Sequence, residues 1–222
     1  MSGRYDCRDR AGREEGIKRA AQAVAAGDLV VLPTDTVYGI GGDAFQPTSV
    51  ERLLTAKGRG RGMPPPVLVP HARTLDGIAT DVTDEVYALA EAFWPGGLTL
   101  VVPMQRTLSW DLGDTGGTVA ARMPLHPVAL ELLDRTGPMA VSSANLTGRA
   151  AARTADEARE QLGESVAVYL EAGEAGSGVP STIVDGTGVV PRILREGAVS
   201  LAELRDVVPT VAAAGEPEAA AP

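Results

Sequence analysis

Residues 29–44 read LVVLPTDTVYGIGGDA, and the predicted fold is built outward from them. The run LVVL (29–32) is continuously apolar, which indicates a strand buried on both faces of a sheet. The polar loop that we expect at 33–44 leaves this strand where open α/β sheets hold their ligands. Its GxGxxA spacing (39–44) resembles a dinucleotide fingerprint, but no helix follows directly and no ribose-binding acid stands about twenty residues further on. A simple turn and a ligand loop remain alternatives for this stretch.

Helical and strand-like patterns alternate along the rest of the chain. Apolar residues at helical spacing predict helices at 14–26, 48–56, 84–93, 127–135 and 154–162, with a last short helix from Ser200. Three of these helices start with a Ser/Thr-x-x-Glu capping box, at Thr48, Thr154 and Ser200. Short apolar runs predict strands at 67–69, 98–102, 119–122, 139–141, 166–170, 182–184 and 189–194.

Such alternation is typical of an α/β domain, in which helices pack on one sheet. We expect a single domain over residues 14–208. Residues 1–13 are expected to form a frayed N-terminus, and residues 209–222 a disordered tail rich in Ala, Pro and Glu.

Composition excludes several classes of function. The chain has 222 residues with 20 Lys and Arg against 29 Asp and Glu, which gives a net charge of −9. This charge disfavours broad nucleic-acid binding, which needs a basic surface. One cysteine, Cys7, allows no internal disulfide and no cysteine cluster for a metal. No apolar run is long enough for a membrane helix and the N-terminus does not resemble a signal peptide, so we expect a cytoplasmic protein that does not bind membranes.

A basic, glycine-rich stretch follows the helix predicted at 48–56. It reads Lys57-Gly58-Arg59-Gly60-Arg61. Glycine lets the backbone approach a phosphate closely, and arginine offers a two-pronged fork to phosphate oxygens. Lysine is otherwise found only at position 18, so Lys57 is less plausible as a generic charge. A solvated basic loop is the alternative.

Polar side chains also stand at the ends of several predicted strands. Arg122 ends an apolar strand, where a charge is costly unless it meets a partner such as a carboxylate. The segment SSANLTG (142–148) holds the only asparagine, Asn145, and its hydroxyl and amide groups suit a nucleotide or an amino acid. Ser181 and Arg195 could face the same crevice. Neither a GxSxG motif nor an acid/base pair is evident, so these residues indicate a polar, phosphate-capable crevice and no particular reaction.

Taken in this order, the segments resemble the YrdC-like threonylcarbamoyl-adenylate synthase family. The matching motifs are PTDTVYGIGGDA (33–44), Lys57-x-Arg59-x-x-x-x-Pro64, WPGGLTLVV (94–102), ARMP (121–124), SSANLTG (142–148), STIVD (181–185) and ILREG (193–197). They fall within residues 14–208, as in the short form of the family that has the catalytic domain alone. The resemblance implies a single-domain, twisted, open mixed sheet with flanking helices and a large central cavity.

The resemblance also implies an activity. A nucleotidyltransferase of this family makes threonylcarbamoyl-AMP and pyrophosphate from L-threonine, bicarbonate and ATP, with Mg²⁺ as the cofactor. The product serves the N6-threonylcarbamoyladenosine modification of tRNA next to the anticodon. The implied downstream partner is the threonylcarbamoyl transferase complex that modifies tRNA, and a weak direct contact with tRNA stays open.

The family's functional positions can be carried over residue by residue. Lys57 and Arg59 match catalytic positions, and the ligands of Mg²⁺ are not assigned. The L-threonine-binding positions match Thr36, Arg122 and Ser181. The ATP-binding positions match Lys57, Arg59, Met63, Thr118, Val141, Ser143, Asn145 and Arg195. The chain departs from the family in two places: Leu68 stands where a threonine-contacting histidine is frequent, and RAAART (149–154) lacks a frequent serine.

Three other functions are compatible with some of these residues. An RNA-binding module for tRNA or double-stranded RNA would use Lys57, Arg59 and Arg61, but the acidic charge and the small number of aromatic residues disfavour it. A carbamoyl-adenylate activity on carbamoyl phosphate, as in hydrogenase maturation, occurs in proteins with additional zinc-finger and acylphosphatase domains. A nucleotide-binding regulator without turnover remains an alternative because of Leu68.

Overall fold

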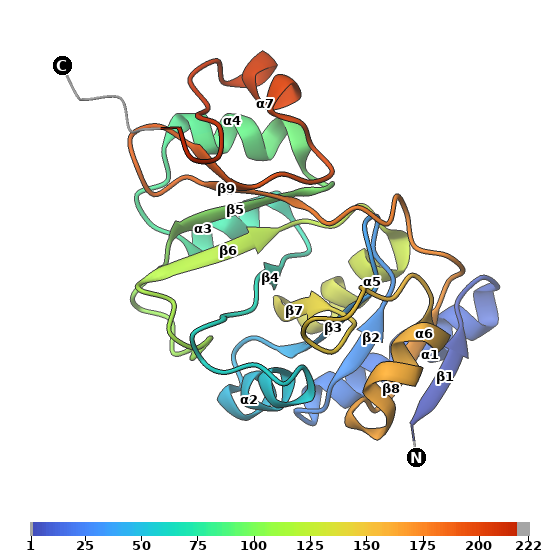
Figure 1. The fold of residues 1–222 in the computed structure, drawn as a ribbon. Coiled ribbons are helices and arrows are strands. Elements are labelled where there is room, and N and C mark those ends of the chain that lie inside the picture. Colours follow the sequence, from blue (N-terminus) through green and yellow to red (C-terminus); the bar gives the residue numbers. More distant parts are fainter. Residues whose placement is uncertain (1, 217–222) are drawn as a thin grey trace.

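The computed structural model describes residues 2–216 and contains one ten-stranded mixed sheet (Figure 1). The strand order is β1-β8-β2-β3-β7-β4-β6-β5-β9-β10. This architecture confirms the predicted α/β class with one mixed sheet and flanking helices. The strands are Gly3–Asp6 (β1), Val30–Leu32 (β2), Gly39–Asp43 (β3), Val67–Leu68 (β4), Leu98–Pro103 (β5), Thr118–Arg122 (β6), Met139–Ser143 (β7), Val168–Glu171 (β8), Thr182–Asp185 (β9) and Arg192–Arg195 (β10).

Helices cover the two faces of the sheet unequally. The helices are Arg10–Ala25 (α1), Pro47–Ala56 (α2), Leu75–Ile78 (α3), Asp84–Phe93 (α4), Pro127–Thr136 (α5), Ala155–Leu162 (α6) and Leu201–Val207 (α7), with short 3₁₀ turns at Ala72–Thr74 and Gly163–Ser165. Helices α1 and α5 pack together over one hydrophobic core, and the other helices cover a second core. Within residues 2–216 we find no helix that combines the length and the apolar character needed to span a bilayer.

Strand β2 explains the continuous apolar run at 29–32. Val30 and Leu32 enter the core beneath α1 and α5, and Val31 enters the core on the other side. Side chains alternate between the faces of a strand, and here both faces are covered, so all three residues are fully buried. The prediction of a buried strand is confirmed.

Strand β3 lies inside the stretch predicted as a loop, and that part of the prediction is wrong. Residues Gly39–Asp43 pair antiparallel with β2 on one side and β7 on the other. The glycines in this strand make its sequence resemble a turn. They are required by close packing, because a Cβ at Gly41 would lie 2.4 Å from the carbonyl oxygen of Ala140 in β7.

The N-terminus also differs from the expectation of a frayed segment at 1–13. Strand β1 pairs in parallel with β8, and α1 begins at Arg10. The side chain of Asp9 caps α1 by accepting a hydrogen bond from the backbone N–H of Gly12 at 2.9 Å. This strand is short and polar, and its partner lies more than 160 residues away in the chain, so local patterning does not indicate it.

The expected tail at 209–222 is ordered in its first part. Val211 is fully buried, and the backbone N–H of Ile193 donates to the carbonyl oxygen of Ala212 at 3.0 Å. The prediction of disorder is therefore wrong for residues 209–216. Residues 217–222 lie outside the described part of the chain.

The predicted helix starts are confirmed to different degrees. Ser200 makes the complete capping box with Glu203, and the side chain of Thr154 accepts from the backbone of Glu157. At α2 the N-cap is Gln46, and no side chain makes a capping hydrogen bond, so the predicted box at Thr48 is absent. The proline at position 47 occupies the first helical position, where its fixed φ favours the helix without a cap.

Candidate functional site

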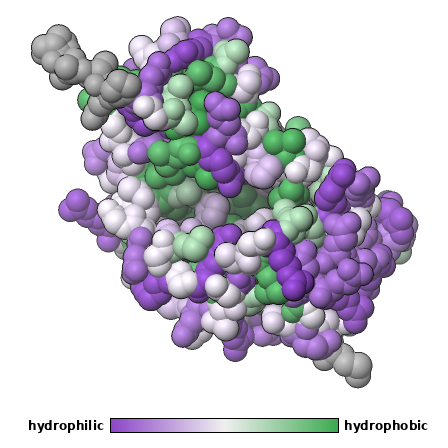
Figure 2. All heavy atoms as spheres, viewed as in Figure 1, coloured by the Kyte–Doolittle hydropathy of each residue, from purple (hydrophilic) through white to green (hydrophobic). Residues whose placement is uncertain are grey.

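A pocket of about 290 Å³ lies against the face of β5, β6 and β9 that is turned away from α4 and α7. Figure 2 shows a hollow in the middle of the molecule at this place, with apolar atoms in and around it. Its walls come from the loop after β2, the stretch after α2, and strands β4 to β7 and β9. The lining residues are Thr34, Thr36, Val37, Tyr38, Gly39, Arg59, Pro64, Pro66, Leu68, Thr99, Arg122, Val141, Ser142, Ser143, Ala151, Pro180, Ser181, Ile183 and Arg195.

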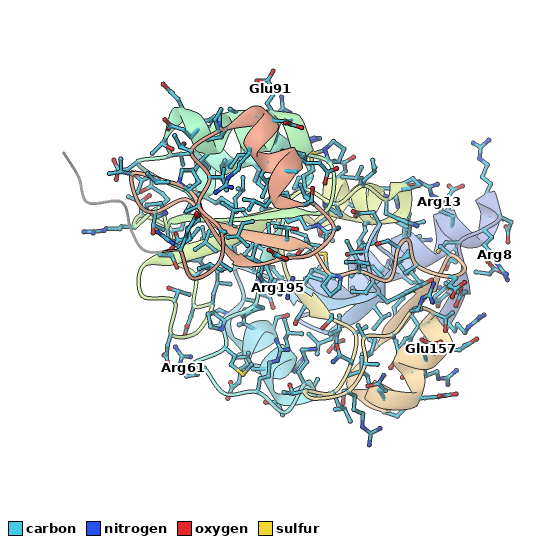
Figure 3. All side chains as sticks on the ribbon, turned by 45° about the horizontal axis from the view of Figure 1, so that its top comes forward. Arg8, Arg13, Arg61, Glu91, Glu157 and Arg195 are labelled. Carbon is cyan, nitrogen blue, oxygen red and sulfur yellow. The ribbon has the colours of Figure 1, made fainter. Side chains whose placement is uncertain are left out.

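Two hollows of larger volume lie elsewhere on the molecule. One, of about 520 Å³, is lined by residues around Cys7 and the start of α1, and the other, of about 900 Å³, by residues around Arg52 and Ser165. Neither contains a residue that the sequence assigned to the site. Figure 3 shows Arg8 and Arg13 at the far side of the molecule from Arg195, which lies near its middle. The smaller pocket is therefore the candidate site.

Arg122, at the end of β6, is held by three oxygen atoms from two parts of the chain, the loop after β2 and the turn after α4. Its Nη2 donates to Asp35 Oδ1 at 2.7 Å, its Nη1 to Thr36 Oγ1 at 2.9 Å, and its Nε to the carbonyl oxygen of Gly96 at 2.8 Å. The residue is only 6% exposed, and burial lowers the pKa of its guanidinium while Asp35 acts in the opposite direction. A guanidinium has five N–H groups, so two remain available in the pocket.

A chain of hydroxyl groups continues from Arg122 into the loop after β2. Thr34 Oγ1 lies 2.6 Å from the carbonyl oxygen of Val37, to which it donates, and 3.0 Å from Thr36 Oγ1. Because the proton of Thr34 is used on Val37, the hydroxyl of Thr36 must donate to Thr34 while it accepts from Arg122. The loop TDT is thus locked in one arrangement beside the guanidinium.

Ser181 and Arg195 form a second polar group across the pocket. Arg195 Nη2 donates to the carbonyl oxygen of Ser181 at 2.6 Å and to its hydroxyl at 3.2 Å, and the same hydroxyl lies 2.8 Å from Thr99 Oγ1. Burial and the nearby Arg122 both lower the pKa of Arg195. The prediction that Ser181 and Arg195 face one crevice is confirmed.

The segment after α2 is hydrogen-bonded to the end of β7 and to the turn that follows it. Arg59 donates from Nη1 to Ser142 Oγ and from Nε to Thr147 Oγ1, both at 3.1 Å. Lys57 is 1% exposed, and its Nζ donates to the carbonyl oxygen of Ser143 and to that of Asn145, the latter at 2.8 Å. Burial and the charge of Arg59 lower the pKa of Lys57 to about 7.

Positive charge collects in this pocket although the chain is acidic overall. Arg59, Arg122 and Arg195 all line it. In the part of the chain that the structure describes, only Arg122 has a carboxylate partner, Asp35. Two unpaired guanidinium groups in a partly buried pocket favour an anionic ligand, because phosphate and carboxylate oxygens can replace the lost hydration.

The structure brings together seven of the predicted site residues: Thr36, Arg59, Arg122, Val141, Ser143, Ser181 and Arg195. Four others lie outside the lining. Lys57 and Asn145 are buried behind it, and Met63 is 49% exposed. The hydroxyl of Thr118 donates to the carbonyl oxygen of Thr115 at 2.9 Å. Leu68 lines the pocket and pairs in register with Arg122, so an apolar side chain stands beside the guanidinium.

Sequence reasoning missed three groups that complete the site. Asp35 is the carboxylate that a buried Arg122 required, and it stands between the two threonines of the PTDT segment. Ser142 holds Arg59, and Thr99 holds Ser181. Because a buried Arg122 needs a carboxylate partner, a search of the polar segments could have identified Asp35. No local signal in the sequence distinguishes Thr99 from other strand residues.

The described residues include no group of three or more His, Cys, Asp or Glu side chains placed to hold a metal ion. The lining of the pocket likewise consists of hydroxyl, guanidinium and apolar groups, with no carboxylate. The protein side chains here do not fit a resident Mg²⁺ ion, which prefers carboxylate, phosphate and water oxygens.

Fold and site define an α/β protein with an arginine-lined pocket beside the ends of its central strands. The chain belongs to the Sua5/YciO/YrdC family, whose model, described as "Telomere recombination", matches residues 22–197. A Mycobacterium tuberculosis H37Rv protein named "Putative threonylcarbamoyl-AMP synthase" is 53% identical over 208 residues, which cover 94% of this chain and 96% of that protein.

Solved structures agree with this membership. The crystal structure of Pyrococcus abyssi Sua5 complexed with L-threonine matches with a TM-score of 0.89 and 32% identity, over 96% of this chain and 62% of the archaeal chain. A Pyrococcus abyssi protein named "Threonylcarbamoyl-AMP synthase" is 36% identical over 195 residues, 86% of this chain and 57% of that protein. E. coli YciO shares the fold, with a TM-score of 0.82 and 24% identity over 92% of this chain and all of that chain.

Proposed function

We propose that this protein is an L-threonylcarbamoyladenylate synthase, a nucleotidyltransferase that makes threonylcarbamoyl-AMP and pyrophosphate from L-threonine, bicarbonate and ATP. The observation that carries the proposal is the gathering of Arg59, Arg122 and Arg195 around one pocket, where Arg122 alone of the three has a carboxylate partner among residues 2–216, Asp35 behind the lining. The names of the mycobacterial and archaeal relatives, and the L-threonine complexed with the archaeal Sua5, support this reaction over other uses of an anionic pocket.

Different groups around the pocket suit different substrates. Two unused N–H groups of Arg122 would bind the carboxylate of L-threonine, with the hydroxyl of Thr36 beside it and that of Ser181 across the pocket. Arg59, which holds Ser142, and Arg195, which holds Ser181, have no carboxylate partner among residues 2–216 and would bind the phosphates of ATP. The hydroxyls of Ser142 and Ser143 also line the pocket.

The chemistry needs orientation and charge neutralisation more than a nucleophilic side chain. The amine of L-threonine, deprotonated, attacks CO₂ derived from bicarbonate and forms a carbamate. A carbamate oxygen then attacks the α-phosphorus of ATP in line, the bond to the bridging oxygen breaks, and pyrophosphate leaves. Guanidinium groups around the phosphates stabilise the charge that develops, which is how phosphoryl-type transfers are mainly catalysed.

Lys57 would support this reaction without touching a phosphate. Its Nζ donates to the carbonyl oxygens of Ser143 and Asn145, and Asn145 Oδ1 lies 3.5 Å away, so no N–H group is left for a phosphate. We therefore assign to Lys57 and Asn145 the task of shaping the turn that presents Ser142 and Ser143 to the nucleotide. Met63 and Thr118, at the edge of this region, would contact ATP only if the neighbouring loops move.

Mg²⁺ enters the proposal as part of the substrate. Since the pocket lining offers it no carboxylate, the ion would arrive bound to the phosphates of ATP, where it neutralises charge. The product is a mixed anhydride of a carbamate and a phosphate and hydrolyses readily, so an acceptor enzyme must follow. We propose that this acceptor is the threonylcarbamoyl transferase complex that modifies tRNA.

The test is one incubation of the purified chain with ATP, Mg²⁺, bicarbonate and L-threonine, followed for pyrophosphate and by mass spectrometry for threonylcarbamoyl-AMP. We expect product only when both L-threonine and bicarbonate are present. Two arginines separated by one residue give a matched control: Arg59 lines the pocket, whereas Arg61 lies outside it and pairs with Asp111 at 2.8 Å. Arg59→Met should abolish most of the activity and Arg61→Met should retain it. Nucleotide binding without product would instead support the regulator.

A further inference from the structure

The side chain of Arg59 lines the pocket and is held in place by two hydroxyl groups, without a carboxylate partner among the described residues. Its Nε donates to Thr147 Oγ1 and its Nη1 to Ser142 Oγ, both at 3.1 Å. Two of its five N–H groups are used in this way, and the other three have no partner among the described residues. An arginine side chain loses considerable rotamer entropy when it is ordered, so the groups that hold it in place contribute to how tightly it binds a ligand.

Thr147 is the firmer of the two supports, because its hydroxyl is itself anchored. It donates its single proton to the carbonyl oxygen of Lys57 at 2.8 Å and accepts from Arg59. The same carbonyl accepts the backbone N–H of Thr147 at 3.1 Å. Lys57 in turn is buried, and its Nζ donates to the carbonyl oxygens of Ser143 and Asn145. The hydroxyl of Thr147 thus connects a rigid buried anchor to the guanidinium of Arg59.

We propose that Thr147 is a positioning residue for Arg59: its hydroxyl holds the guanidinium at the edge of the pocket, ready for the phosphates of ATP. Thr147 is exposed and does not line the pocket, so it acts through Arg59 and not on the nucleotide. The inference rests on the proposed function, because the ligand of Arg59 is the triphosphate assigned there.

A double-mutant cycle on nucleotide affinity tests this directly. Dissociation constants of MgATP and of AMP are measured by calorimetry for the unmodified chain, Thr147→Val, Arg59→Met and the double variant. Valine has the shape of threonine without its hydroxyl, and the backbone bond to Lys57 remains. We expect Thr147→Val to weaken MgATP binding by about five- to tenfold, which corresponds to the net worth of one hydrogen bond, and AMP binding by less than about twofold. In the Arg59→Met background the same substitution should have no further effect, because nothing is left to position.

Two controls isolate the hydroxyl. Thr147→Ser retains it and should bind MgATP like the unmodified chain. Thr55→Val removes the hydroxyl of another exposed threonine, one that makes no side-chain hydrogen bond within residues 2–216, and should change nothing. Thermal unfolding of each variant shows that it is folded, and Thr147→Ala serves if the valine variant is not.

The inference is overturned if Thr147→Val binds MgATP as tightly as the unmodified chain, or if it weakens binding equally with and without Arg59. Both results leave the proposed function intact, since the unmodified chain still binds MgATP. Failure of the unmodified chain to bind MgATP would overturn the proposed function, and the role of Thr147 with it.

Discussion

Arg122 illustrates what a buried charge requires at the scale of one residue. Its guanidinium is held by Asp35 and Thr36 of the loop after β2 and by the carbonyl oxygen of Gly96 in the turn after α4. Asp35 also accepts the backbone N–H of Leu125 at 2.9 Å, which ties the loop after β6 to the same carboxylate. The Arg122–Asp35 ion pair and the hydrogen bonds around it therefore tie together the loops that follow β2, α4 and β6.

Replacing Arg122 by lysine should affect L-threonine more than ATP. A lysine keeps the charge, but its three N–H groups cannot hold Asp35, Thr36 and the carbonyl oxygen of Gly96 and also make a two-pronged contact with a carboxylate. We expect Arg122→Lys to raise the KM for L-threonine by roughly tenfold or more, with a smaller change in the KM for ATP. Steady-state pyrophosphate release against each substrate measures both. An unchanged KM for L-threonine would contradict the placement of its carboxylate at Arg122.

The lowered pKa of Lys57 predicts that the free energy of unfolding depends on pH. Its pKa in the folded protein is about 7, against an ordinary value of 10.5, because of burial and Arg59. Between these two values the unfolded chain binds the proton and the folded chain largely does not, so the free energy of unfolding rises with pH. Below the folded pKa of Lys57, about 7, the protein carries the full cost of burying a charged lysine. This cost decreases as the pH rises and is absent above the unfolded pKa of 10.5.

We expect the free energy of unfolding to increase between pH 7 and pH 9 by about 2 kcal/mol more in the unmodified chain than in Lys57→Met, which cannot titrate. Urea unfolding at the two pH values measures both increases. The increase in Lys57→Met comes from all other titrating groups, so the difference between the two proteins is due to Lys57. Equal increases in both proteins would mean that the oxygen acceptors around Nζ keep Lys57 protonated.

At the scale of elements, strand β3 decides the geometry of the site. It joins β2 to β7 and so brings the loop after β2, with Thr34 and Thr36, next to the end of β7, with Ser142 and Ser143. Its glycines permit this close pairing. A side chain at Gly41 would meet both the carbonyl oxygen of Ala140 and the side chain of Val141, at 2.4 and 2.5 Å.

Gly41→Ala should therefore be destabilising although alanine is small. We expect the free energy of unfolding to fall by about 2 kcal/mol, because backbone and not a flexible side chain must move. Gly77→Ala in α3 is the matched control: nothing lies within 4 Å of the added Cβ, and alanine favours a helix. Urea unfolding of the two variants compares them. A Gly41→Ala protein as stable as Gly77→Ala would show that β3 and β7 can separate without cost.

For the whole molecule, the distribution of charge matters more than its sum. The chain has a net charge of −9, yet its pocket contains two guanidinium groups without a carboxylate partner among the described residues. Low-dielectric walls concentrate such a local field and attract a small anion, while the acidic outer surface repels a large one. This arrangement suits a nucleotide triphosphate far better than a nucleic acid.

Binding of tRNA to the free protein should consequently be weak. We expect a dissociation constant above about 1 µM at about 150 mM salt, and a steep further loss as the salt concentration rises. A fluorescence titration with labelled tRNA at several salt concentrations measures both quantities. Tighter binding at that salt concentration would revive the RNA-binding alternative and would require a basic surface outside the pocket.

The sequence by itself determined the fold class and most elements. Burial on one or both faces leaves a periodic pattern, which is why the helix at 84–93 and the strand at 29–32 were predicted where α4 and β2 lie. It also pointed to Arg122, since a charge at the end of an apolar strand needs a partner. The ends of two further predicted strands indicated Ser181 and Arg195, whose side chains meet in the structure, and the motif resemblance then implied their ligands.

Only the tertiary structure decided which groups satisfy one another. Arg122 and Asp35 are 87 residues apart in the chain, and Lys57 and Asn145 are 88 apart. Strands β1 and β3 lack an apolar pattern of their own and exist because β8, β2 and β7 offer them partners. A local pattern records whether a residue is buried, but hydrogen bonding and ion pairing are satisfied between segments that only the folded chain brings together.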